Sequence, residues 1–142
     1  MSLKVLEKLN RAAFDKGYAA IEKAKPERVI MRSFEVDGGK CGTAYCIGGW
    51  MSHANRQKVL DEAASLLNPD MDPALGKKLD QLLYMKPVTN GTPLGLHIFD
   101  DRPAANRKEI VLRVLDTFLE TGRVKWRSII RAHDKETGYV ER

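Results

Sequence analysis

The spacing of apolar residues along the chain predicts a series of amphipathic helices. From position 3 to about position 25, apolar and small residues recur at steps of three and four, which is the period of one helix face. Pro26 ends this helix, because proline cannot donate the backbone hydrogen bond that a helix interior needs. Small side chains at Ala13, Gly17 and Ala20 predict that another element approaches this helix closely.

Three further helices follow from the same periodicity. The stretch 55–68 places its apolar residues on one broad face. Asp72 followed by Pro73 is typical of a helix start, and the apolar positions after it predict a helix to about residue 84. The clearest apolar stripe predicts a helix over 104–121, with Gly122 where a left-handed C-cap belongs.

The connecting segments are less sharply defined. Residues 27–40 fit either a short helix or an extended segment before the turn signal "DGGK". Residues 85–103 contain three prolines and predict a long loop that packs down or carries function. Residues 127–142 fit a short frayed helix or a loosely packed tail. The fold class predicted is mainly α, a single domain over residues 1–142 with about five helices in a bundle and little or no sheet.

Composition agrees with a globular domain. The chain has 142 residues, of which 43% are hydrophobic and 30% are charged. No apolar run approaches the roughly 20 residues of a membrane span, and the first residues lack the features of a secretory signal. We therefore expect a cytoplasmic protein with no membrane partner, whose two cysteines are reduced.

The charge is unevenly distributed along the chain. Of the net charge of +5, residues 1–30 contribute +3, residues 31–101 contribute −2 and residues 102–142 contribute +4. Basic ends that share one face of the fold would attract nucleic acid. Acidic and basic residues also interleave within both ends, which is typical of ordinary solvated helix faces.

The stretch "KCGTAYCIGGWMSH", residues 40–53, contains the strongest candidate chemistry. Thr43 predicts the N-cap of a helix, which places Cys46 in the first turn, where the helix dipole lowers the pKa of a thiol. A nucleophilic Cys46 needs a histidine as base. His53 lies about 10 Å further along the same helix, out of reach. The base would therefore be His97 or His133, and Cys46 with His97 are the candidate catalytic residues.

The same stretch also fits close packing of the backbone. Gly42 lets the chain turn, while Gly48 and Gly49 remove side chains where a neighbouring segment or a ligand approaches. Cys46 and Trp50 are four residues apart, so the indole can cover the first turn. The residues assigned to packing or ligand binding are Cys41, Gly42, Thr43, Gly48, Gly49, Trp50 and His53.

A metal centre is not predicted from this stretch. Cys41, Cys46 and His53 have the spacing C-x4-C-x6-H, which lacks the paired cysteines of the usual zinc sites. Three ligands would also need a fourth from elsewhere, such as His97 or Asp100. We expect no metal and no cofactor.

The motif resembles that of an uncharacterised family of small bacterial and phage proteins. The family pattern is Cys-Gly-Thr-x-x-Cys-x-(Ala/Gly)-Gly-(Trp/His), and residues 34–54 and "TGRVKW" at 121–126 are similar to it. Glu35, Val36, Gly48 and Met51 depart from the residues common in that pattern. The resemblance implies no activity.

Three functions remain open at this point. The first is a protein-interaction or self-association module, working with a protein partner or as a homo-oligomer. The second is a cysteine-dependent enzyme or thiol sensor that uses Cys46, with Cys41 as its partner thiol. The third is nucleic-acid binding through the basic ends. The sequence contains no Walker loop, dinucleotide fingerprint or HExxH motif, which argues against the common nucleotide-dependent and zinc-hydrolase classes.

Overall fold

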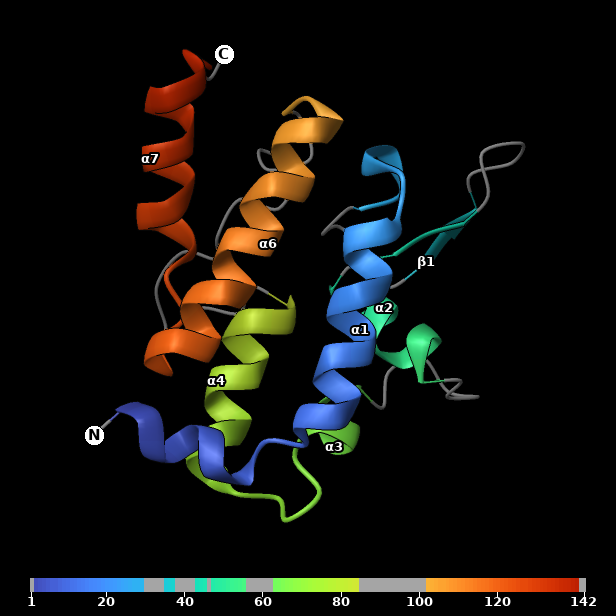
Figure 1. Ribbon diagram of the computed structural model, residues 1–142, viewed down its shortest axis with the longest axis vertical. Helices are drawn as coiled ribbons and strands as arrows, with labels where there is room; N and C mark the ends of the chain where they lie inside the picture. Colours follow the sequence, from blue (N-terminus) through green and yellow to red (C-terminus); the bar gives the residue numbers. More distant parts are fainter. Residues whose placement is uncertain are drawn as a thin grey trace.

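The computed structural model describes residues 2–29, 35–37, 43–45, 47–55, 63–84 and 102–140 (Figure 1). The fold is mainly helical, as predicted, and the described sheet is one short hairpin. The described elements are the 3-10 helices η1 (Ser2–Lys8) and η2 (Pro26–Arg28), the strands β1 (Glu35–Asp37) and β2 (Thr43–Tyr45), and the α-helices α1 (Arg11–Lys23), α2 (Ile47–Ala54), α3 (Ala63–Leu67), α4 (Pro73–Tyr84), α6 (Ala104–Thr121) and α7 (Trp126–Thr137).

The N-terminal region is two helices, so the prediction of one helix over 3–25 was wrong. The chain breaks at Asn10, whose side chain caps α1 by accepting the Ala13 N–H at 3.3 Å. The Asn10 backbone N–H donates to Leu67 O at 2.9 Å, and its side-chain amide donates to Leu66 O at 3.2 Å. Asn10 therefore begins α1 and ties it to the end of α3.

The prediction of a helix N-cap at Thr43 was also wrong. Thr43 pairs with Asp37 in an antiparallel hairpin, and α2 begins only at Ile47. Val36, Thr43 and Tyr45 are β-branched or aromatic, and such side chains favour strands over helix starts. The extended alternative for residues 35–37 is thus the correct one.

The predicted starts and ends of α4 and α6 are confirmed. Asp72 Oδ2 accepts the Leu75 N–H at 2.9 Å, which caps α4 with Pro73 in its first position. Gly122 ends α6 in the left-handed conformation at φ 71°, and its N–H donates to Phe118 O at 2.7 Å. Of the helix predicted over 55–68, the described part is α3, and residues 56–62 lie outside the described ranges.

One hydrophobic core joins these helices. Its largest fully buried side chains are Phe14, Phe118, Ile21, Ile47, Met51, Leu67, Leu75, Leu79, Leu82, Leu83 and Ile110. The predicted close approach to Gly17 is confirmed, because a Cβ there would overlap Met51 Sδ and lie 3.1 Å from Met51 Cα. Helices α1 and α2 therefore pack with their backbones close together at this point.

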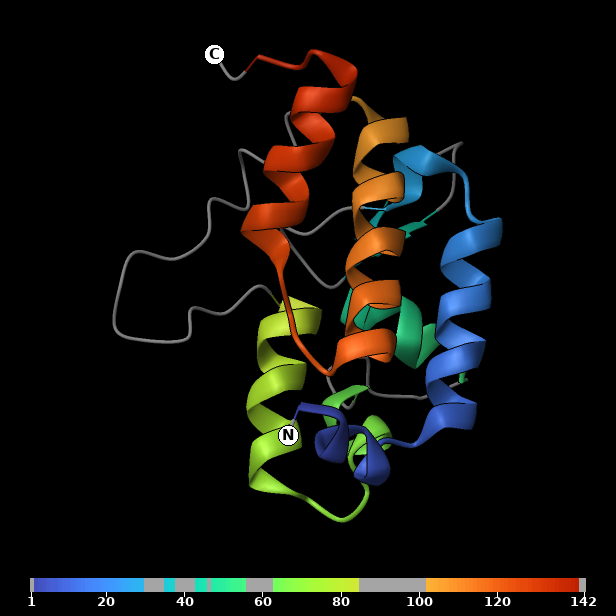
Figure 2. The ribbon, with the colours of Figure 1, turned by 60° about the vertical axis from the view of Figure 1, so that its left-hand side comes forward.

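Helix α6 lies between α1 and α7 in both views of the ribbon (Figures 1 and 2). Basic side chains near its start hold the end of α1 and the segment after it. Lys108 Nζ donates to Glu22 O at 2.6 Å and to Ala24 O at 2.7 Å, and Arg107 Nε donates to Val29 O at 3.1 Å. These bonds satisfy carbonyls that the end of a helix leaves without partners. None of the described helices combines the length and hydropathy that a membrane span needs.

Candidate functional site

The structure places only part of the cysteine-glycine stretch. Cys41, Gly42, Cys46 and His97 lie outside the described residues, so the predicted thiol site lies there too. Thr43 belongs to β2, and Gly48, Gly49, Trp50 and His53 belong to α2.

The described part of the stretch forms a buried helix. Gly48, Gly49 and Trp50 are buried, whereas His53 is exposed at the end of α2. Trp50 Nε1 donates to Arg28 O at 3.2 Å, and its indole meets the His53 ring edge-on at 6.0 Å between centroids. The structure thus brings Trp50 and His53 together, while His133 packs against α6.

A second set of functional candidates lies on α7, which has two chemically different faces. Its inner face packs toward the core through buried Trp126 and the partly buried Ile129 and Ile130. Trp126 Nε1 donates to Gln81 O at 2.9 Å, which joins the start of α7 to α4. The segment that the sequence left between a frayed helix and a tail is thus helical from 126 to 137.

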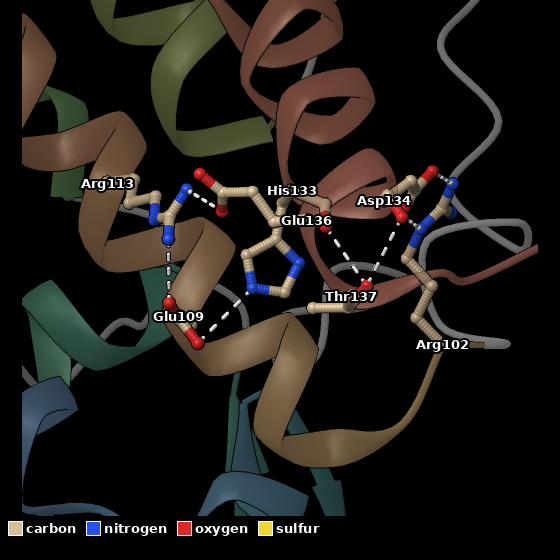
Figure 3. A network of polar contacts seen from close by, with 7 residues as sticks. All are labelled: Arg102, Glu109, Arg113, His133, Asp134, Glu136 and Thr137. Carbon is tan, nitrogen blue, oxygen red and sulfur yellow. Dashed lines mark hydrogen bonds and ion pairs between the residues drawn. The ribbon is translucent and has the colours of Figure 1, made fainter.

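A buried ion pair holds the far end of α7. Arg102, just before α6, donates from Nε to Asp134 Oδ1 at 2.9 Å and from Nη2 to Asp134 Oδ2 at 2.6 Å (Figure 3). The Arg102 side chain is 4% exposed, and the Tyr139 ring covers its guanidinium with 4.7 Å from Cζ to the ring centroid. Two parallel charged hydrogen bonds fix orientation as well as distance, so this pair sets how α7 lies on α6.

A second polar group joins α6 to the last turns of α7 (Figure 3). Arg113 of α6 donates to Glu136 Oε2 of α7 at 2.7 Å and to Glu109 Oε1 at 2.8 Å. Glu109 Oε2 lies 3.2 Å from Nε2 of the fully buried His133, without the alignment of a regular hydrogen bond. In the described part of the chain, His133 Nδ1 has no hydrogen-bond partner.

These contacts shift the ionisation of the α6 side chains. The pKa of Glu109 is lowered from the ordinary 4.5, first by His133 and then by the Arg113 guanidinium. The carboxylates of Glu136 and Glu109 raise the pKa of Arg113. The charged forms of Glu109 and Arg113 are therefore favoured at neutral pH. The carboxylates of Glu109 and Glu136, where α6 meets α7, are both paired with Arg113.

The outer face of α7 is basic. Arg127, Arg131 and Lys135 are all exposed and follow one another at steps of four residues, which corresponds to a rise of about 6 Å per step along one side of the helix. We call these three residues the basic face. Two small exposed side chains, Ser128 and Ala132, lie among them.

The basic and acidic residues of α7 are thus separated. Asp134 and Glu136 pair with arginines, Asp134 with Arg102 and Glu136 with Arg113. Within the described ranges, the three side chains of the basic face form no ion pair. The acidic side chains of α7 are therefore paired with arginines of the bundle, and its three basic side chains are exposed to solvent.

The sequence indicates the basic C-terminal end of the chain, whereas the row of Arg127, Arg131 and Lys135 is defined by the helix. The four-residue step from 127 to 131 to 135 is visible in the sequence and becomes decisive once 126–137 is treated as a helix. The contacts of Asp134 with Arg102 and of His133 with Glu109 join residues far apart in the chain, and no local pattern signals them.

Comparison of the chain with protein-family models, with curated proteins and with solved structures gives no match.

Proposed function

We propose that this chain acts by binding, and that the basic face of α7 is the surface with which it contacts a negatively charged polymer. The observation that carries the proposal is the separation of charge on α7. Arg127, Arg131 and Lys135 are exposed and unpaired among the described residues, whereas the two acids of the same helix are held by arginines. Three exposed cations in a row create a local positive potential that attracts polyanions.

The anchoring of α7 makes this surface suitable for binding. Trp126 joins its start to α4, and Arg102 holds Asp134 near its end. The backbone of the helix is thus ordered before any partner arrives, so less conformational freedom is lost on binding. A rigid row of cations is a better polyanion site than the same residues on a mobile tail.

A second copy of the chain is a poor partner for this face. A twofold dimer places the same patch of both subunits in contact. Arg127, Arg131 and Lys135 of one copy would then meet three cations of the other, which repel one another. The self-association hypothesis would need a different surface.

Heparin-affinity chromatography tests the proposal. We compare the native chain with the variant R127Q/R131Q/K135Q and with K16Q/K23Q/K77Q. The control variant removes the same number of charges from exposed lysines on α1 and α4. The native chain and the control should elute at similar high salt, and the α7 variant at much lower salt. Equal retention of the two variants would contradict the proposal. The net charge of the protein, and not the position of the charges on α7, would then determine heparin binding.

A further inference from the structure

The geometry of α7 points to one class of partner, and this inference rests on the proposed function. We propose that the polyanion is duplex DNA, and that α7 lies in its major groove with the basic face directed to the phosphates that border the groove.

The position and size of α7 suit a groove. The helix lies at the edge of the bundle, with α6 between it and α1 (Figures 1 and 2). A helix with its side chains measures about 10–12 Å across, and the major groove of B-form DNA is about 12 Å wide. The small side chains of Ser128 and Ala132 lie among the basic residues and keep the exposed side of the helix narrow.

The charge pattern suits a duplex backbone. Arg127, Arg131 and Lys135 span two steps of four residues, or about 12 Å along the helix axis. Duplex DNA carries one negative charge for about every 1.7 Å of its axis, so a row of this length passes several phosphates. The only acids of α7 between residues 126 and 137, Asp134 and Glu136, are already neutralised by arginines.

Single-stranded nucleic acid and duplex RNA fit less well. Single strands are bound by stacking bases on exposed aromatic rings. On α7 and the residues after it, Trp126 is 3% exposed and the Tyr139 ring lies against Arg102. The major groove of duplex RNA is deep and narrow, so a helix of this width does not enter it.

A membrane surface or a protein partner also fits less well. Membrane-surface helices insert an apolar face, but Ile129 and Ile130 of α7 are turned toward the protein core. Protein interfaces depend on large buried anchors. Among the described residues, the exposed large apolar side chains are Met71 and Val140, neither of which lies on the basic face.

Fluorescence anisotropy with the full chain tests the inference. The labelled probes are a mixed-sequence DNA duplex of about two helical turns, one of its strands alone, and an RNA duplex of the same sequence; unlabelled vesicles of anionic phospholipid serve as competitor. We expect the DNA duplex to bind most tightly. With three phosphate contacts, its affinity should fall by about 40-fold between 50 and 200 mM salt.

Variants locate the contact. R127Q/R131Q/K135Q should lose the duplex affinity and most of its salt dependence, whereas K16Q/K23Q/K77Q should keep both. R127K/R131K should keep the salt dependence, because it keeps the charges. Circular dichroism of each variant shows whether the helices are intact, which exposed substitutions should leave unchanged.

The outcomes separate this inference from the proposed function. Equal or tighter binding of the single strand, the RNA duplex or the vesicles would overturn the DNA assignment. If heparin retention still depended on the basic face, the proposed function would stand. A native chain that binds neither heparin nor the DNA duplex, or binding that R127Q/R131Q/K135Q leaves unchanged, would overturn both.

Discussion

Arg102 and Asp134 form a two-point ion pair between the start of α6 and the end of α7, with donor–acceptor distances of 2.9 and 2.6 Å. The arginine is almost wholly buried, at 4% exposure, and its partner carboxylate is 20% exposed. Together with the buried Trp126 and the partly buried Ile129 and Ile130, this pair orients α7 on the bundle. It also removes a carboxylate from the field of Arg131 and Lys135 on the outer side.

The first prediction concerns this pair. Asp134→Ala leaves the Arg102 charge buried without its partner, so we expect the free energy of unfolding to fall by about 3 kcal/mol. Urea unfolding measures the change. The control is Asp15→Ala, which breaks the exposed Arg11–Asp15 pair of α1, with exposures of 60% and 57%, and should cost less than about 1 kcal/mol.

The double variant R102M/D134L sharpens this test. It replaces both charges by apolar groups of similar size and should recover much of the stability lost in Asp134→Ala. If Asp134→Ala costs no more than Asp15→Ala, the pair does not hold α7 in the way described.

The second prediction concerns the close contact of α1 with α2. Gly17→Ala introduces a Cβ that overlaps Met51 Sδ and lies 3.1 Å from Met51 Cα, and Met51 is fully buried. We expect a loss of about 1–3 kcal/mol in the free energy of unfolding. Gly76→Ala in α4 is the matched control, because its Cβ would lie 3.6 Å from Asn68 Nδ2. That variant should be neutral or stabilised by up to about 1 kcal/mol.

The third prediction concerns Glu109 and pH. Because the folded-state pKa of Glu109 is lowered from 4.5, its ionised form stabilises the fold above that pH, and this contribution is lost as the pH falls through the lowered pKa. Unfolding in guanidinium is measured at about pH 5 and about pH 3 for the native chain and for Glu109→Gln. The native chain should lose more stability than the variant on acidification. An equal loss in both would show that Glu109 is not coupled to His133 and Arg113.

The fourth prediction concerns Tyr18, which joins α1 to α6. Burial, followed by a hydrogen bond with Asp116, raises the pKa of Tyr18 to about 12. Its stabilising contribution is complete below pH 10 and disappears as the pH rises from 10 to 12. In an ultraviolet titration, Tyr18 should therefore ionise late, and Tyr18→Phe should remove that late step.

A second variant separates the causes of this shift. Asp116→Asn should lower the pKa of Tyr18 but leave it above 10, because burial is the larger cause and persists. A return of the pKa to 10 in this variant would show that Asp116 alone produced the shift.

Local sequence signals predicted the parts of the fold that depend on neighbouring residues. Asp72 with Pro73 marked the start of α4, and Gly122 marked the end of α6, because caps are made by residues a few positions apart. Gly17 marked the approach of α2, since a glycine on a helix's apolar face leaves room for another backbone.

The sequence failed where distant contacts override local preference. The apolar periodicity is continuous over residues 3–25, yet the helix is interrupted at Asn10. The backbone and side-chain amides of Asn10 donate hydrogen bonds to the end of α3. Thr43 has the chemistry of an N-cap, but pairing with Asp37 makes it part of a strand. The basic face of α7 was not predicted because residues 127–142 fit either a frayed helix or a tail, and the row of basic side chains forms only on a helix.

The location of the binding surface can be measured directly. In a nuclear magnetic resonance titration of the full, isotope-labelled chain with short heparin fragments, backbone amide shifts report which residues meet the polymer. We expect the largest changes to cluster at Arg127, Ser128, Arg131, Ala132 and Lys135. Changes concentrated on α1 or α4, with α7 unaffected, would contradict this expectation.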